Sequence, residues 1–87
     1  MSNDEEPERR PAPRKQLVRA AIVSFEGPTS PIPCVLLDVS ASGVRVNVHR
    51  PDDVPDRFLL RVETEGMERT CQVAWRRGEE IGASFID

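Results

Sequence analysis

The chain has 87 residues, which is enough for one domain and too few for two. A domain of this size buries only about 60% of the surface that its unfolded chain exposes, so a deep catalytic cleft is hard to build, whereas a surface binding site is not. The formal net charge of −3 gives little support to general attraction toward DNA or RNA, although a local group of cations still attracts a small anion.

Residues 1–16 are rich in charge and proline and contain almost no side chains that a core would bury. Acidic residues come first and basic residues follow, while prolines at positions 7, 11 and 13 disfavour a helix. We predict that this segment is a flexible arm in the free protein and that the folded domain spans residues 17–87.

The remainder of the chain reads as six short strands separated by turns. The strongest signal is Val44–Val48, which alternates apolar and polar residues in strict period two. The predicted strands are Leu17–Phe25, Cys34–Val39, Val44–Val48, Phe58–Thr64, Arg69–Arg76 and Ile81–Ile86. One short helical turn is expected within Pro51–Arg57. The pattern predicts an all-β domain, either an antiparallel barrel or a sandwich, and closure into a barrel removes exposed strand edges.

Period-two alternation also predicts which way side chains face on the fifth strand. It places Cys71, Val73 and Trp75 on one side of Arg69–Arg76, so we expect Trp75 to pack in or beside the core rather than against a ligand.

The chain offers little for catalysis or metal binding. His49 is the single histidine, and Cys34 and Cys71 lie inside apolar strand patterns without the CxxC spacing typical of zinc sites. We expect both cysteines to be small buried side chains. We therefore predict no enzymatic activity and no metal site.

Nothing in the sequence directs the chain into a membrane. No stretch approaches the roughly 18–20 apolar residues that cross a bilayer. The acidic, polar N-terminus also lacks the apolar segment of a secretory signal. We therefore expect a cytoplasmic protein without membrane insertion.

Arg10 and Arg14 lie four residues apart on the proline-containing arm, and Arg9 precedes them. In a polyproline II conformation they would be about 12 Å apart, so one arm would place two guanidinium groups on different parts of one ligand. A guanidinium group binds phosphate through paired hydrogen bonds, reads guanine O6 and N7, or stacks on a purine. The alternative is a solubilising charge run whose arginines pair with the acidic residues at positions 4–8.

Asp38, Ser40 and Gly43 lie where the second predicted strand meets the third. In the structural interpretation they form a turn, in which Asp and Ser bond to the backbone and Gly supplies positive φ. In the functional interpretation Asp38 accepts hydrogen bonds from the donor edge of a guanine, Ser40 adds a hydroxyl and Gly43 admits the ligand close to the backbone. Arg45, on the polar side of the next strand, would add charge beside this turn.

The two motifs together resemble the PilZ domain, the bacterial receptor family for the second messenger cyclic di-GMP. The family pattern is RxxxR followed by [D/N]xSxxG, which matches Arg10–Arg14 and Asp38–Gly43. Val73–Trp75 and Gly82–Phe85 are similar to the family's V-x-W and G-x-x-F stretches. The resemblance covers residues 9–86, and no motif position is substituted.

The resemblance implies a six-stranded antiparallel β-barrel that binds cyclic di-GMP and requires no other cofactor. It makes Arg10 and Arg14 a clamp over the ligand, with Arg9 as a further phosphate contact. The implied barrel-side contacts are Asp38, Ser40 and Gly43. Ordering of the arm over the ligand would then pass the signal to a partner protein.

Two other functions fit parts of the pattern. One is a protein-interaction adaptor that keeps the PilZ fold without depending on the nucleotide, although its intact motifs argue against this. The other is a small nucleic-acid-binding barrel of the OB or cold-shock kind, which needs exposed aromatic side chains for base stacking. The four aromatic residues lie mostly at positions predicted for the core, and the acidic balance is also unfavourable.

Overall fold

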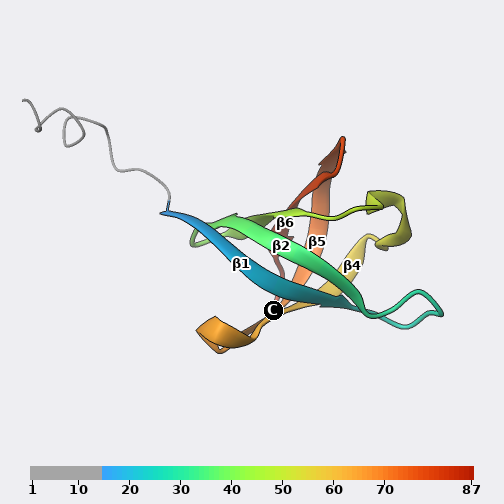
Figure 1. The fold of residues 1–87 in the computed structure, drawn as a ribbon, viewed down its shortest axis with the longest axis horizontal. Helices are drawn as coiled ribbons and strands as arrows, with labels where there is room; N and C mark the ends of the chain where they lie inside the picture. Colours follow the sequence, from blue (N-terminus) through green and yellow to red (C-terminus); the bar gives the residue numbers. More distant parts are fainter. Residues whose placement is uncertain (1–14) are drawn as a thin grey trace, which may run out of the picture.

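In the computed structural model, which describes residues 15–87, six antiparallel strands close into a barrel (Figure 1). The strands are β1 (Lys15–Ser24), β2 (Ile32–Val39), β3 (Gly43–Asn47), β4 (Arg57–Val62), β5 (Met67–Arg77) and β6 (Glu80–Phe85). Around the barrel they follow the order β1–β2–β3–β6–β5–β4, and β4 closes against β1. The antiparallel barrel predicted from the sequence is confirmed, and the sandwich is excluded.

The fourth strand is shorter than predicted. It ends at Val62 rather than at Thr64, because Glu63–Glu65 form a 3-10 turn. Gly66 closes this turn with a φ of 63°, in the left-handed region that favours glycine. The predicted strand therefore runs two residues, Glu63 and Thr64, past the point where the backbone leaves the sheet.

Three strands begin two residues before their predicted starts, and the remaining strand ends shift by at most one residue. β2 begins at Ile32 and β5 begins at Met67. β1 begins at Lys15, two residues before the predicted start at Leu17. The predicted helical turn is a 3-10 turn over Pro51–Asp53. Within residues 15–87, no helix has the length and apolar character that spanning a membrane requires.

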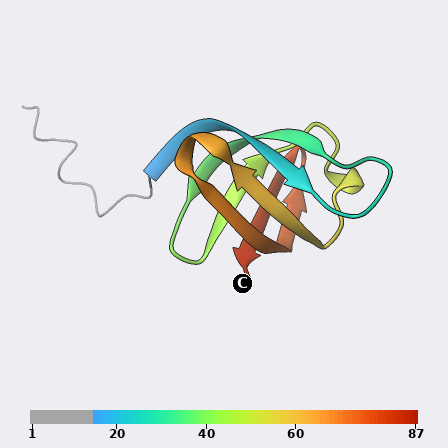
Figure 2. The same cartoon turned by 90° about the horizontal axis from the view of Figure 1, so that it is seen from below.

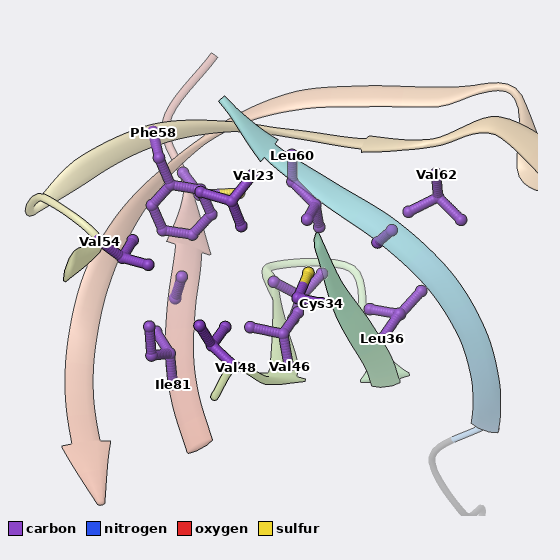
Figure 3. Close-up of a cluster of buried hydrophobic side chains, with 14 residues drawn as sticks. Val23, Cys34, Leu36, Val46, Val48, Val54, Phe58, Leu60, Val62 and Ile81 are labelled. Atoms are coloured by element: carbon purple, nitrogen blue, oxygen red, sulfur yellow. The ribbon is translucent and has the colours of Figure 1, made fainter. Parts of the chain in front are cut away.

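One apolar cluster fills the barrel, and every strand contributes to it (Figure 3). Val44 and Val46 on β3 are buried, whereas Arg45 and Asn47 between and after them are partly exposed, as the strict alternation predicts. Fully buried side chains, one from each strand, are Val23, Leu36, Val46, Leu60, Cys71 and Ile81. Full burial of such a side chain stabilises the fold by about 1.5–3 kcal/mol.

The pairing of β3 with β6, which are distant in sequence, places the turn between β2 and β3 on the barrel. β3 pairs with β6, with Val44 opposite Ala83 and Gly43 opposite Ser84. In Figure 2 the yellow-green β3 and the red β6 run side by side. The turn between β2 and β3 therefore lies next to the β5–β6 pair.

Cys34 on β2 and Cys71 on β5 are both buried in the core, which confirms the prediction for the two cysteines. Burial raises the pKa of the Cys34 thiol to about 12 and that of the Cys71 thiol to about 11, and for Cys71 the negative charge of Asp87 adds to the effect. Both thiols are therefore protonated near neutral pH, and a protonated thiol is a poor nucleophile.

We expect neither thiol of the native protein to react with Ellman's reagent slightly above neutral pH, and both to react after unfolding in guanidinium. The folded-state pKa values lie above the unfolded value of about 8.5. The thiols' contribution to stability is therefore complete below the unfolded pKa and is lost as the pH rises toward the folded values. Rapid labelling of the native protein, or stability that increases through this pH interval, would contradict the assignment.

Candidate functional site

A depression with a volume of about 220 Å³ lies on the outer surface of the barrel, across β2, β3, β6 and β5. The lining residues that matter here are Asp38, Ser40, Gly43, Arg45, Trp75 and Gly82. All three barrel-side residues predicted for the site therefore line one surface feature. Typical small-molecule sites measure about 300–1,000 Å³. The depression is therefore smaller than a typical small-molecule site.

A β-bulge on β2 turns Asp38 toward this depression. Leu36 pairs with Val46, and both point into the core, but the next pair is Asp38 with Arg45. β2 therefore uses two residues where β3 uses one. Regular alternation would point Asp38 inward like Leu36, whereas the extra residue moves it to the outer face, where it contacts Arg45.

A second bulge, on β5, turns Trp75 toward the depression. Val73 pairs with Ala83 and packs against the core, but the next pair is Trp75 with Gly82. The inserted residue, Ala74, moves Trp75 to the outer face, where it is 38% exposed. The prediction that Trp75 shares a face with Cys71 and Val73 is wrong, because it counts alternation through a residue that the bulge inserts.

The indole ring of Trp75 lies directly on Gly82. A Cβ atom at Gly82 would overlap Cε2 and Nε1 of the ring, so only glycine leaves room for the indole in this position. Arg77 lies with its guanidinium carbon 5.3 Å from the ring centroid, within the range of a cation–π contact. An aromatic surface is therefore held at one side of the depression.

The turn between β2 and β3 is built by Ser40. Its Oγ accepts hydrogen bonds from the backbone N–H groups of Ser42 and Gly43, each at 3.3 Å. Its own N–H donates to the carbonyl oxygen of Gly43 at 2.8 Å. The structural interpretation of Ser40 as a turn residue is thus confirmed, and its hydroxyl also lines the depression.

Gly43 is required for a different reason from the one that the turn pattern predicts. The positive-φ glycines are Gly27, Gly66 and Gly78, so Gly43 does not supply a left-handed conformation. A Cβ atom on Gly43 would instead overlap the carbonyl oxygen of Ala83 on β6. Gly43 therefore lets the backbones of β3 and β6 approach closely beside the depression.

Arg45 joins two carboxylates on the outer face of the barrel. Its Nη2 lies 2.9 Å from Oδ2 of Asp38, and its Nη1 lies 2.9 Å from Oε1 of Glu80. The hydrogen bond to Glu80 raises the pKa of Arg45 most, and the hydrogen bond to Asp38 raises it further. Asp38 is only 5% exposed, so its carboxylate is covered while the guanidinium remains accessible. Among residues 15–87, no three His, Cys, Asp or Glu side chains gather to hold a metal ion.

The arm joins the barrel beside this site. In the β1–β2 pair, Lys15 lies opposite Val39 and Gln16 opposite Asp38, so the first described residue is one position from the Ser40 turn. The predicted ligand contacts Arg9, Arg10 and Arg14 lie outside the described residues, as does nearly all of the predicted arm, so their roles stay predictions.

Comparison with known proteins identifies the family. A family model for the PilZ domain matches residues 8–87, nearly the whole chain. The chain belongs to the PilZ family. PilZ domains are generally cyclic di-GMP-binding domains, and the family is one of ligand-binding and adaptor domains rather than of enzymes. A search of curated proteins found no match.

Proposed function

We propose that this PilZ domain is a receptor for cyclic di-GMP, which binds across the depression beneath the arginines of the arm. One observation carries the proposal. The family's barrel-side residues line the depression, and β1 enters the barrel directly beside them. The RxxxR motif, Arg10–Arg14, ends directly before β1 and is complete.

The chemistry divides between the barrel and the arm. Asp38 offers acceptor oxygens to the donor edge of a guanine, and the partly exposed indole of Trp75 offers a surface for stacking. Arg10 and Arg14 offer paired N–H donors to the two phosphates, with Arg9 adding a further cation. Because the depression alone is small, closure of the arm is what would cover the ligand.

In this proposal the signal is the position of the arm. An arm that orders over the ligand presents a new surface, and a partner protein that binds this surface preferentially would receive the signal. The rival function is a PilZ adaptor that binds its partner equally with and without the nucleotide.

The test is isothermal titration calorimetry with cyclic di-GMP on the wild type, Arg14→Ala and Arg19→Ala. Losing one charge-assisted paired contact is expected to weaken binding of Arg14→Ala by about tenfold to a hundredfold. Arg19→Ala is the matched control, because Arg19 pairs with Glu65 at 2.9 Å and does not line the depression. We expect its affinity to stay within about twofold of the wild type.

Each outcome separates the two functions. Binding by the wild type that Arg14→Ala loses supports the receptor and assigns the arm to the site. No heat from a folded wild type overturns the receptor and leaves the nucleotide-independent adaptor. Equal losses in both variants would show that general charge, rather than the motif position, governs binding.

A further inference from the structure

Arg45 occupies the centre of the outer surface that the two bulges create. On β3 it lies opposite Asp38 of β2 and opposite Gly82 of β6. Gly82 in turn lies opposite Trp75 of β5. Neighbouring strands in a sheet are about 4.7–4.9 Å apart. Arg45 therefore lies on the strand beside Gly82, and the indole ring lies over that glycine.

Two carboxylates fix the guanidinium in place. Nε and Nη2 of Arg45 both contact Oδ2 of Asp38, at 3.0 Å and 2.9 Å, while Nη1 contacts Glu80 at 2.9 Å. Glu80 lies two residues before Gly82 on β6, so it shares the same face and reaches Arg45 diagonally. A guanidinium so held has already lost most of its rotamer freedom before any ligand arrives.

The contacts with Asp38 and Glu80 do not exhaust the hydrogen-bonding capacity of Arg45. A guanidinium group has five N–H donors. Nε and Nη2 contact Asp38 and Nη1 contacts Glu80, so these contacts do not use all five donors. The side chain is 31% exposed and lines the depression, whereas Asp38 beneath it is almost fully covered. This part of the depression therefore presents to a ligand the accessible guanidinium of Arg45 and the small exposed part of the Asp38 side chain.

A carboxylate and a guanidinium side by side match the edge of one base. Guanine carries N–H donors next to its O6 acceptor, and arginine pairs with guanine O6 and N7 through two hydrogen bonds. Adenine presents an N6 donor where guanine has O6, so it would oppose the guanidinium. A base stacked on the face of Trp75 that points away from Gly82 would have Arg45 at its edge.

We infer that Arg45 is a specificity-determining residue that contacts the O6 and N7 acceptors of a guanine stacked on Trp75, with Asp38 and Glu80 as its positioning residues. This inference rests on the proposed function, because it assigns the base contact within the same cyclic di-GMP site. It adds a fixed cation on the barrel to the arginines of the arm.

The test compares Arg45→Lys with Arg61→Lys by calorimetry, using cyclic di-GMP and cyclic di-AMP. Lysine keeps the charge beside Asp38 but lacks the planar pair of donors. We expect Arg45→Lys to bind cyclic di-GMP about tenfold to a hundredfold more weakly, with no matching loss for cyclic di-AMP. Arg61 is the control, because it pairs with Glu68 on the neighbouring strand and does not line the depression.

A spectroscopic measurement on the wild type gives a second readout that a purely structural role would not move. The Nε–H signal of Arg45 is assigned by its absence from the spectrum of Arg45→Lys. We expect this signal to shift when cyclic di-GMP is added and that of Arg61 to stay in place.

The outcomes distinguish failure of the Arg45 role from failure of cyclic di-GMP binding itself. If the folded wild type does not bind cyclic di-GMP, the proposed function fails and the role of Arg45 fails with it. If the wild type binds, but Arg45→Lys keeps its affinity and the Nε–H signal of Arg45 does not move, only the role of Arg45 is overturned. Equal losses for both nucleotides would assign Arg45 to the phosphates and also overturn the base contact.

Discussion

Replacing Gly43 with alanine is expected to lower the free energy of unfolding by about 2–4 kcal/mol. The added Cβ atom would overlap the carbonyl oxygen of Ala83 on the neighbouring strand. Because that oxygen belongs to the backbone, no side-chain rotation relieves the overlap, and β3 must move away from β6. Urea denaturation followed by far-UV circular dichroism measures the loss.

Gly82→Ala is the matched control, since it adds the same methyl group on the strand that pairs with β3. Its Cβ would overlap the indole of Trp75 rather than backbone atoms, and an exposed ring can turn away. We expect a loss of about 1 kcal/mol or less, together with a change in the fluorescence of the chain's single tryptophan. Equal losses in the two variants would show that the close approach of the two backbones is not what requires Gly43.

The strands of this barrel can be predicted from the local alternation of apolar and polar residues, whereas the two bulges cannot. Alternation of apolar and polar residues predicts β3 correctly, because successive residues of a regular strand face opposite sides. The same rule fails for Trp75, since one inserted residue reverses the alternation beyond it. Nothing in the sequence of β5 marks Ala74 as the inserted residue. Bulges often lie beside functional sites, so the rule fails where the site is built.

The candidate site shows a similar division between local and long-range information. The motif residues Asp38, Ser40 and Gly43 are close in sequence, and their grouping at one turn can be predicted. The contact of Arg45 with Glu80 depends on the register between β3 and β6, which lie far apart in the chain. From the sequence, Arg45 is only a charge beside the turn, and its partner on β6 cannot be identified without that register.

Replacing Leu60 with alanine is expected to cost about 2–5 kcal/mol of stability, a large part of the roughly 5–15 kcal/mol that holds a typical domain folded. Leu60 on β4 is fully buried, and its removal leaves a cavity in the single core of the barrel (Figure 3). Leu59→Ala supplies the control, because the adjacent residue faces outward and is only partly buried. We expect its cost to be about 1 kcal/mol or less.

The same pair of variants separates stability from binding. Leu60 does not line the depression, so Leu60→Ala that is still folded is expected to bind cyclic di-GMP with wild-type affinity. Because only the folded state binds, saturating ligand should then raise the apparent stability of the wild type and of the variant by equal amounts. A folded variant that has lost its affinity would show that the shape of the depression depends on core packing around Leu60 of β4. Binding would then depend on the core and not only on the residues at the barrel surface.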